Sequence, residues 1–261
     1  MIGSIVRAFQ GIIENTTNGY LPLPEPDLSI GKSLKGKDIF AYKFGDGSRK
    51  ILFMGGIHGN EVGTVKLMHK LIDYLNESSK ELQSKVYVIP CLNPDGHEIA
   101  KKSPDYFGGG RFGRFNANNV DLNRNFEAKS FSSKNNWFFG NSNVSIYCGE
   151  SPLSEPESRL FAEFVKNNGI SIVYSLHNRG KEVMGSKDNL AQKLTRDYAQ
   201  KTGYKYISEE HWKSMKQTGT LKEWCENNNV SYVEVESGTR YGSDWKNQKN
   251  AIIEALNNYH G

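Results

Sequence analysis

Two histidines and one glutamate could together bind a metal ion, although they come from distant stretches of the chain. His58 and Glu61 stand in the sequence GGIHGNE, where an apolar run ends and a helix is expected to begin, and His177 follows the apolar run ISIVYSL. Two imidazoles and one carboxylate leave a fourth position for water, which is typical of catalytic zinc, and the imidazoles favour zinc over magnesium. We therefore expect one Zn²⁺ ion.

Each part of this set also has a simpler interpretation. A histidine and a glutamate three residues apart occur by chance in many chains, and Glu61 could merely cap a helix beside a polar turn. His177 could be an ordinary hydrogen-bonded residue at a strand end. The other histidines have no such partners, and we interpret them as structural or exposed: His69, His97, His211 and His260.

The segment RFNANNVDLNRNF (114–126) is rich in groups that bind anions. Its arginines Arg114 and Arg124 and its amides Asn123 and Asn125 could bind a carboxylate and stabilise an oxyanion, if the loop is rooted beside a strand end. The alternative is a surface turn rich in asparagine. Leu122 and Phe126 argue against it, because they flank the polar pair as apolar anchors would.

A strand near the C-terminus carries two acids. In SYVEVESGT (231–239), Glu234 and Glu236 lie on the same face of the strand. Two carboxylates in an apolar strand cost roughly several kcal/mol if they are buried without partners. At least one should therefore have a function, and beside an activated water that function is general base catalysis.

The elements that must position these residues alternate between strand and helix, which indicates an α/β fold. The runs IFAYKFG (39–45) and ILFMGGI (51–57) are predicted strands, and the intervening Asp46, Gly47 and Ser48 predict a hairpin between them. Apolar residues then recur at helical spacing from Glu61 to Leu75. The run VYVIPCL (86–92) follows as a strand that should pair in parallel with the second run.

Further along, the pattern changes. Residues 93–152 predict about sixty residues of mostly loop, which in a compact domain is usually functional. Ser154, Glu155, Pro156 and Glu157 then form a predicted capping box with proline in the first helical turn. The remaining predicted elements are a strand at 170–176, a helix near 188–202, a short helix around 221–226, a strand at 231–236 and a closing helix at 245–259.

Composition excludes several classes of function. The 261 residues have a net charge of +4 spread over 33 basic and 29 acidic residues, without the basic block of a nucleic-acid arm. No run of about eighteen apolar residues could span a membrane. The N-terminal run has no signal-peptide pattern, so we expect a cytoplasmic chain.

Cys91, Cys148 and Cys225 are predicted to be reduced thiols. Residues 1–30 are predicted to form an extended lead-in, and residues 31–261 a single domain.

Six segments, in order, resemble the zinc metallocarboxypeptidase family: GGIHGNE, NPDG, NVDLNRNF, YCGESPLSEPE, SLH and VEVESG. The resemblance runs from about residue 30 to the end. The compact loop at 114–126 and the short chain are most similar to bacterial murein peptide amidases, which remove diaminopimelate from cell-wall peptides. The family implies a three-layer α/β/α fold with a mixed, mostly parallel central sheet.

The resemblance also implies roles for individual residues. His58, Glu61 and His177 match the positions of the zinc ligands, and Arg114 that of the arginine that polarises the scissile carbonyl. Asn123 and Arg124 match the pair that binds the terminal carboxylate of the substrate.

Two registers compete for the catalytic glutamate. Counting from Val230 favours Glu236, whereas aligning the later sequence TRYG favours Glu234; we choose Glu236 because of its place at the strand end. Leu221 matches a position that lines the specificity pocket. The capping tyrosine of digestive members is missing from HWKSMKQTGTL (211–221), although Tyr204 or Tyr206 could reach into the site.

The leading hypothesis is therefore a zinc peptidase that cleaves the bond before the last residue of a short peptide with a free carboxylate, such as a muropeptide. A second hypothesis is an N-acyl amino acid deacylase of the aspartoacylase or desuccinylase type, and a third is a non-catalytic peptide-binding module. The oligomeric state is left open.

Overall fold

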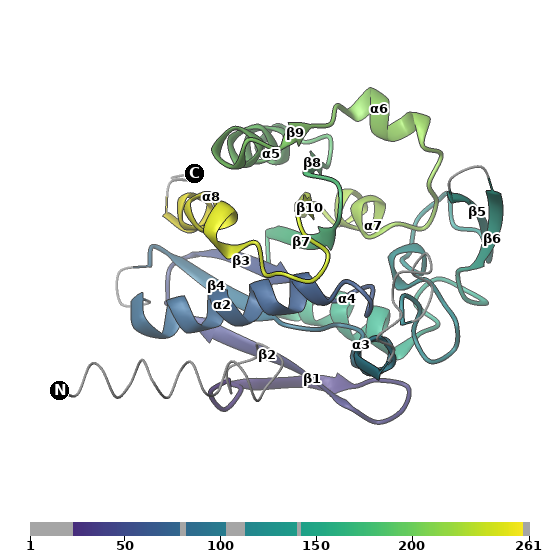
Figure 1. The fold of residues 1–261 in the computed structure, drawn as a ribbon, viewed down its shortest axis with the longest axis horizontal. Coiled ribbons are helices and arrows are strands. Elements are labelled where there is room, and N and C mark those ends of the chain that lie inside the picture. The colour runs from purple at the N-terminus through teal and green to yellow at the C-terminus, as the bar shows by residue number, and fades with distance from the viewer. Residues whose placement is uncertain (1–22, 79–81, 103–112, 140–141, 258–261) are drawn as a thin grey trace.

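The computed structural model describes residues 23–78, 82–102, 113–139 and 142–257, and a large β-sheet organises them (Figure 1). This sheet has eight strands in the order β1-β2-β4-β3-β7-β10-β8-β9. Its strands are β1 (Leu28–Lys32), β2 (Asp38–Phe44), β3 (Arg49–Met54), β4 (Ser84–Ile89), β7 (Ile172–Asn178), β8 (Glu182–Gly185), β9 (Lys205–Tyr206) and β10 (Ser231–Ser237).

The centre of the sheet is parallel. The strands β4, β3, β7 and β10 pair in parallel with one another, and antiparallel pairs join β2 to β4 and β10 to β8. Apolar side chains on both faces of β3 and β7 are buried, as the continuous apolar runs predict. Glu236 and His177 are direct neighbours across β10 and β7, so both lie at the carboxyl edge of the sheet.

Helices cover both faces of the sheet, which confirms the predicted three-layer α/β fold. One core lies between the sheet and α2 (Val62–Ser78), α5 (Asn189–Thr202) and α8 (Trp245–Asn257). The other core lies between the sheet and α4 (Pro156–Asn168) and α7 (Leu221–Asn227). α6 (Glu209–Ser214) lies beyond β8, where Trp212 packs against Met184.

The predicted hairpin between residues 39–45 and 51–57 is wrong. β4 lies between β2 and β3, pairing antiparallel with the former and parallel with the latter. The Asp46–Ser48 turn therefore crosses over the start of β4. Gly47 packs against the backbone there so closely that an added Cβ would lie 1.8 Å from the carbonyl oxygen of Gln83. The hairpin partner of β2 is instead β1.

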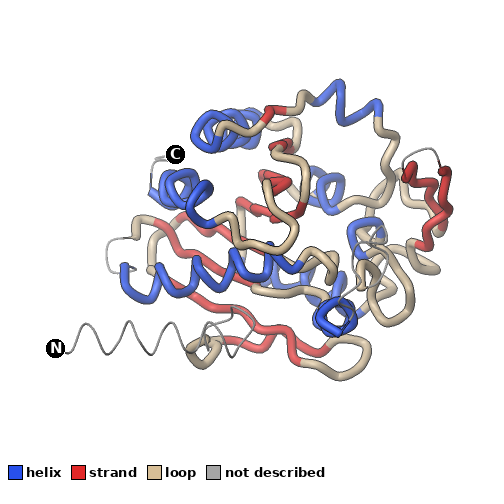
Figure 2. Tube along the Cα trace, viewed as in Figure 1, coloured by secondary structure: helices blue, strands red, loops and turns tan. Residues whose placement is uncertain are grey.

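The stretch predicted as mostly loop contains regular structure. The NPDG sequence opens a helix, α3 (Pro94–Lys102), and DLNR forms a 3₁₀ turn, η2 (Leu122–Arg124), that is capped by the side chain of Asp121. β5 (Lys134–Phe139) and β6 (Ser142–Tyr147) form a separate two-stranded sheet at the edge of the molecule (Figure 2). The prediction missed these elements because none shows a clear hydrophobic period.

The predicted capping box is also wrong. The N-cap of α4 is Glu155, which makes no side-chain capping bond, although Pro156 does occupy the first turn as predicted. Glu157 accepts hydrogen bonds from the backbone N–H of Leu34 and from Asn116, and is fully buried. Glu157, the glutamate of the predicted capping box, therefore makes tertiary contacts and does not cap the helix.

At the chain ends, two predictions fall partly or wholly on residues that the structure does not describe. The prediction that the chain has no signal peptide concerns residues 1–22, which lie outside the described residues. Tyr259, at the predicted end of the last helix, also lies outside them. Within the predicted lead-in, β1 begins at Leu28. None of the helices in the described ranges is long and apolar enough to cross a membrane.

Candidate metal centre and its cavity

The turn between β3 and α2 brings His58 and Glu61 together. The backbone N–H of Glu61 donates to the carbonyl of His58 (3.0 Å), so the two side chains project from one tight turn. Thr64 Oγ1 donates to the carbonyl of Glu61 and accepts from the N–H of Gly56. Gly56 has a φ of 62°, a conformation that costs glycine little. Gly56 of the GGIHGNE segment therefore allows the tight turn that carries the two candidate ligands His58 and Glu61.

The turn is also locked against two neighbouring segments by three glycines, which we call the glycine junction: Gly59, Gly96 and Gly113. A Cβ added to Gly59 would lie 2.2 Å from the N of His97, and one added to Gly96 would lie 2.5 Å from the carbonyl oxygen of Gly113. Close backbone packing of this kind tolerates only glycine. The junction thus ties the His58 turn and α3 to the segment that begins with Arg114.

His177 joins His58 and Glu61 from the end of β7. Nδ1 of His58 lies 2.9 Å from Glu61 Oε1, and Nδ1 of His177 lies 3.2 Å from Glu61 Oε2. The ligand atoms of the three residues all lie within 4.8 Å of one another, and all three side chains are buried. The structure therefore brings together the three residues that the sequence predicted as a metal site.

The outer nitrogen of each histidine has its own partner. Nε2 of His58 lies 3.1 Å from Asp121 Oδ1, and Nε2 of His177 lies 3.0 Å from Ser175 Oγ. Such contacts fix the ring orientation and leave Nδ1 facing inward, and a metal-binding histidine usually uses its other ring nitrogen for a hydrogen bond of this kind. Asp121 was not predicted as a functional residue, although it lies within the NVDLNRNF segment.

The charges in this cluster are strongly coupled. Burial alone would raise the pKa of Glu61, but His58 and His177 lower it overall. Burial would lower the pKa of His177, yet Glu234 and then Glu61 raise it to about 9. Burial is also outweighed at Asp121, where Arg114 and then His58 hold the pKa well below its usual value. The cluster thus favours ionised carboxylates beside the two imidazoles.

These residues fit a zinc ion. Two imidazole nitrogens and a carboxylate are the donor set of catalytic zinc sites, which keep one position open. Glu61 Oε2 is buried and makes no hydrogen bond, although it lies near His177. A buried acceptor without a hydrogen bond is costly, and a cation between the three side chains would satisfy it. Among the described residues, this is the one cluster with metal-binding geometry.

A cavity of about 370 Å³ opens beside the three residues. Arg114, Asn123 and Arg124 all line it, as predicted for the anion-binding segment. Arg114 is fixed by Asp121, whose Oδ2 accepts from Nε (3.2 Å) and Nη2 (3.0 Å). Asn123 is held by its Oδ1, which accepts from the backbone N–H of Leu221 (3.2 Å).

Glu234 and Glu236 line the same cavity from β10. Glu236 is partly exposed and makes no hydrogen bond or ion pair with another described residue, whereas Tyr232 donates to Glu234 Oε2 (2.6 Å). Burial and then repulsion from Glu61 raise the pKa of Glu236 to about 8. A divalent cation beside Glu61 would weaken that repulsion. Of the two acids on β10, Glu236 is thus the one whose carboxylate has no hydrogen-bond partner among the described residues, whereas Glu234 lies 3.8 Å from Nε2 of His177.

Leu221 does not lie where the sequence predicted. Its side chain is fully buried in the core and is absent from the cavity wall, because the capping of α7 by Thr220 turns it toward the sheet. Tyr204 and Tyr206 do not line the cavity either; their hydroxyls donate to Asp244 and Gln192. The 211–221 segment instead contributes three side chains to the wall: Trp212, Met215 and Gln217.

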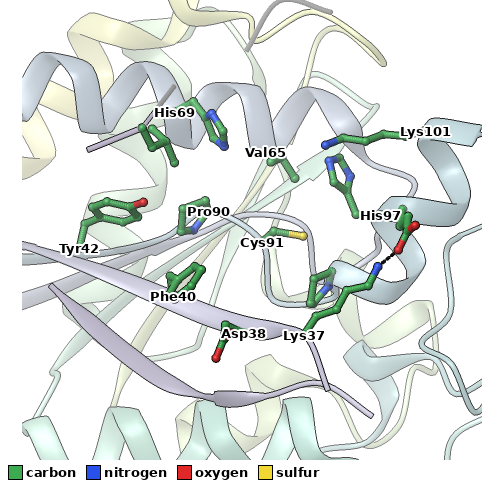
Figure 3. Close-up of a pocket in the computed structure, with 13 residues that line it drawn as sticks. Lys37, Asp38, Phe40, Tyr42, Val65, His69, Pro90, Cys91, His97 and Lys101 are labelled. Carbon is green, nitrogen blue, oxygen red and sulfur yellow. Dashed lines mark ion pairs between the residues drawn. The ribbon is translucent and has the colours of Figure 1, made fainter. Parts of the chain in front are cut away.

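A second cavity of about 370 Å³ shares no lining residue with the first (Figure 3). Burial lowers the pKa of His69 and His97 to about 4, so both rings are neutral near pH 7. Burial also raises the pKa of Cys91 to about 12, which makes its thiol a poor nucleophile. All three cysteines are free, as predicted. This cavity therefore offers no comparable catalytic set.

Comparisons with known proteins agree with this arrangement. The profile of the zinc carboxypeptidase family matches residues 26–258. The carboxypeptidase N catalytic chain of Rattus norvegicus is 30% identical over 179 residues, which cover 58% of this chain and 38% of that one. The chain therefore spans well under two thirds of the length of this relative.

Two solved structures share the fold. The murein-tripeptide amidase MpaA from Escherichia coli O157 superposes with a TM-score of 0.70 at 22% identity, covering 92% of this chain and 94% of that chain. An aspartoacylase family protein from Mesorhizobium loti superposes with a TM-score of 0.55 at 15% identity, covering 90% of this chain and 69% of that chain.

Proposed function

Because the chain belongs to the zinc carboxypeptidase family, we propose that it hydrolyses the amide bond before the C-terminal residue of a short peptide. The observation that supports this most is the convergence of three ligand atoms within 4.8 Å, beside a cavity that both Glu236 and Arg114 line. The family is zinc-dependent, and His58, Glu61 and His177 would hold one ion. Bound zinc supplies Lewis acidity, which polarises a carbonyl and acidifies water.

The substrate would be oriented by its terminal carboxylate. Arg124 donates from Nη1 to the carbonyl of Asn123 (2.7 Å), so the two residues act as one rigid unit. Because the backbone N–H of Leu221 already donates to Oδ1 of Asn123, the side-chain NH₂ group of Asn123 is the part that can donate to a substrate. The guanidinium and the NH₂ group together suit a carboxylate.

Proton transfer is assigned to Glu236. As a carboxylate without a partner at the edge of the sheet, it can take a proton from the attacking water and return it to the leaving amine. Arg114, held by Asp121, would stabilise the oxyanion that develops on the scissile carbonyl. Glu234, which already accepts a hydrogen bond from Tyr232, is the weaker candidate for the base.

For the natural substrate we propose a cell-wall muropeptide that ends in diaminopimelate. The support is the fold shared with the murein-tripeptide amidase over nearly the whole of both chains, together with the similar compact loop at 114–126. N-acyl amino acids are the competing substrates, because the aspartoacylase family protein has a related fold.

The test is hydrolysis of tri- and tetrapeptide stems, with L- and D-configured ends, beside N-acetyl and N-succinyl amino acids, followed by mass spectrometry. Glu236→Gln should lower kcat by roughly 10²- to 10⁴-fold while zinc content, measured by plasma mass spectrometry, stays near one ion per chain. Glu254→Gln on α8, which removes an acid paired with Lys201, is the matched control and should keep full activity. An active Glu236→Gln with an inactive Glu234→Gln would assign the base to Glu234 instead.

A further inference from the structure

The second cavity, which the proposed reaction does not use, lies between β2 and the helices α2 and α3. Asp38, Phe40 and Tyr42 alternate along β2, so their side chains share the face of the sheet on which the cavity lies. Phe40 remains 39% exposed there. The volume of about 370 Å³ lies within the range of small-molecule sites, roughly 300–1,000 Å³. The cavity is therefore large enough for a small organic ligand.

This cavity has an apolar end and a cationic end (Figure 3). Phe40, Tyr42 and Pro90 form the apolar end. His97 and Lys101 lie at the other end, one helical turn apart on α3. A ligand that fills the whole cavity must therefore combine an apolar body with a polar group at one end.

The charge at the cationic end comes from lysine. Burial and then repulsion from Lys101 lower the pKa of His69 to about 4. Burial also lowers the pKa of His97 to about 4, with a further contribution from Lys101, although the hydrogen bond to Gly59 opposes both. Both rings are thus neutral near pH 7, and the ammonium group of Lys101 creates a positive potential that reaches each of them.

The two acids that line the cavity do not cancel this potential. Asp38 pairs with Lys32 at 3.0 Å, and Glu98 pairs with Lys37 and with Lys102. Each acid therefore has a cation of its own, and Lys101 adds a positive charge to a set that is already compensated. An anionic group is accordingly the ligand charge that this end of the cavity favours.

We propose that the second cavity binds a small organic acid, with its carboxylate at Lys101 and its apolar chain against Phe40, Tyr42 and Pro90. The carboxylate gains a charge-assisted hydrogen bond from the ammonium group, and the chain removes the exposed surface of Phe40 from water. This binding site is distinct from the proposed hydrolytic site, because the two cavities share no lining residue.

Calorimetry tests the charge and the chain of the ligand. It uses the zinc-loaded variant Arg124→Gln, which weakens the competing carboxylate site in the catalytic cavity. Octanoate should bind with a Kd of roughly 1–10 mM, the range for a ligand of about ten non-hydrogen atoms. Octylamine has a similar chain with the opposite charge, and acetate has the charge without the chain. Each should bind at least about tenfold more weakly than octanoate. Equal binding of octanoate and octylamine, or no binding of octanoate, would overturn the proposal.

Two neighbouring lysines locate the carboxylate. In the same background, Lys101→Gln should weaken octanoate binding by roughly tenfold, the effect of losing a hydrogen bond to a charged group. Lys102→Gln removes the same charge from the next position of α3, which is exposed and does not line the cavity. This control should change the Kd by less than about twofold, because exposed charges are screened. Equal weakening in both variants would show that only net charge matters and would refute the assignment.

Histidine NMR locates the bound acid. Octanoate should shift the ring resonances of His69 and His97, which line the second cavity, and leave those of the exposed His211 unchanged. Shifts confined to His58 and His177 would instead place the acid at the metal centre, and the second site would be wrong. None of these measurements depends on hydrolysis. A protein that binds octanoate in this way but cleaves no peptide would keep this site and lose only the proposed function.

Discussion

At the scale of single residues, Asp121 joins the candidate metal ligand His58 to Arg114, the residue proposed to stabilise the oxyanion. One of its oxygens lies 3.1 Å from Nε2 of His58, and the other accepts both hydrogen bonds from Arg114. It is fully buried, so neither contact is screened by water. One carboxylate therefore positions a candidate ligand and a candidate catalytic residue together.

Asp121→Asn should consequently weaken zinc binding by roughly 10- to 100-fold, the usual effect of losing the partner of a metal-binding histidine. It should also lower kcat, because Arg114 loses its ionic partner. Competition with a chromogenic chelator measures the zinc affinity. Ser175→Ala, which removes the neutral partner of His177, is the matched comparison and should cost less. Equal zinc affinity in Asp121→Asn and the native protein would refute the positioning role.

Sequence alone was enough to predict that His58, Glu61 and His177 lie close together, as the structure has them, because each lies at a strand end or in a tight turn that apolar runs and glycines reveal. It was not enough for Leu221. Which way the first residue of a short helix points depends on its cap, and Thr220 turns this one into the core. Asp121 was missed for a related reason, since its partners His58 and Arg114 become visible only in three dimensions.

At the scale of elements, the glycine junction determines how the ligand turn meets the arginine segment. Gly96→Ala would place a Cβ 2.5 Å from the carbonyl oxygen of Gly113 and 2.7 Å from that of Phe115. We expect about 1–3 kcal/mol of destabilisation, as for other overpacking changes. We also expect lower kcat, because the segment that carries Arg114 must move. Thermal unfolding and steady-state kinetics measure the two effects.

Gly203→Ala provides the control for this prediction. Gly203 ends α5 with a φ of 71°, and an added Cβ would meet nothing within 4 Å. Gly203→Ala should therefore lower the free energy of unfolding by about 1 kcal/mol through backbone strain alone, and it should leave kcat unchanged. If both variants lost stability and activity in the same proportion, the junction would have no specific influence on the site.

The elements also show where local patterns mislead. The turn Asp46–Ser48 has hairpin composition, but nothing local reveals that β4 lies between the strands it joins. Likewise, the spacing of Ser154 and Glu157 matches a capping box, yet the tertiary partners Leu34 and Asn116 take the glutamate. Both errors concern long-range pairing, whereas the elements with a clear hydrophobic period were predicted correctly.

At the scale of the whole molecule, the metal should link segments that are far apart in the sequence. His58 and Glu61 follow β3, and His177 lies near the end of the neighbouring strand β7. An ion that binds only the folded state at a concentration a hundred times its Kd stabilises that state by about 2.7 kcal/mol. In a protein of this size, we expect zinc to raise Tm by roughly 5–10 °C relative to a chelator.

His177→Ala should abolish this rise in Tm. His211→Ala, which removes an exposed histidine of α6, should preserve it. Differential scanning calorimetry with zinc and with a chelator measures both. A full zinc effect in the His177 variant would mean that the ion binds elsewhere.

The position of β10 also governs the order in which a growing chain can complete its structure during translation. β8 is made well before β10 but reaches the main sheet only through it, and β9 pairs only with β8. β8 and β9 must therefore wait, unpaired with the body of the sheet, until β10 leaves the ribosome. Because that strand also carries Glu234 and Glu236, two of the acids that line the cavity, a nascent or truncated chain that lacks it would be incompletely folded and would lack the proposed general base.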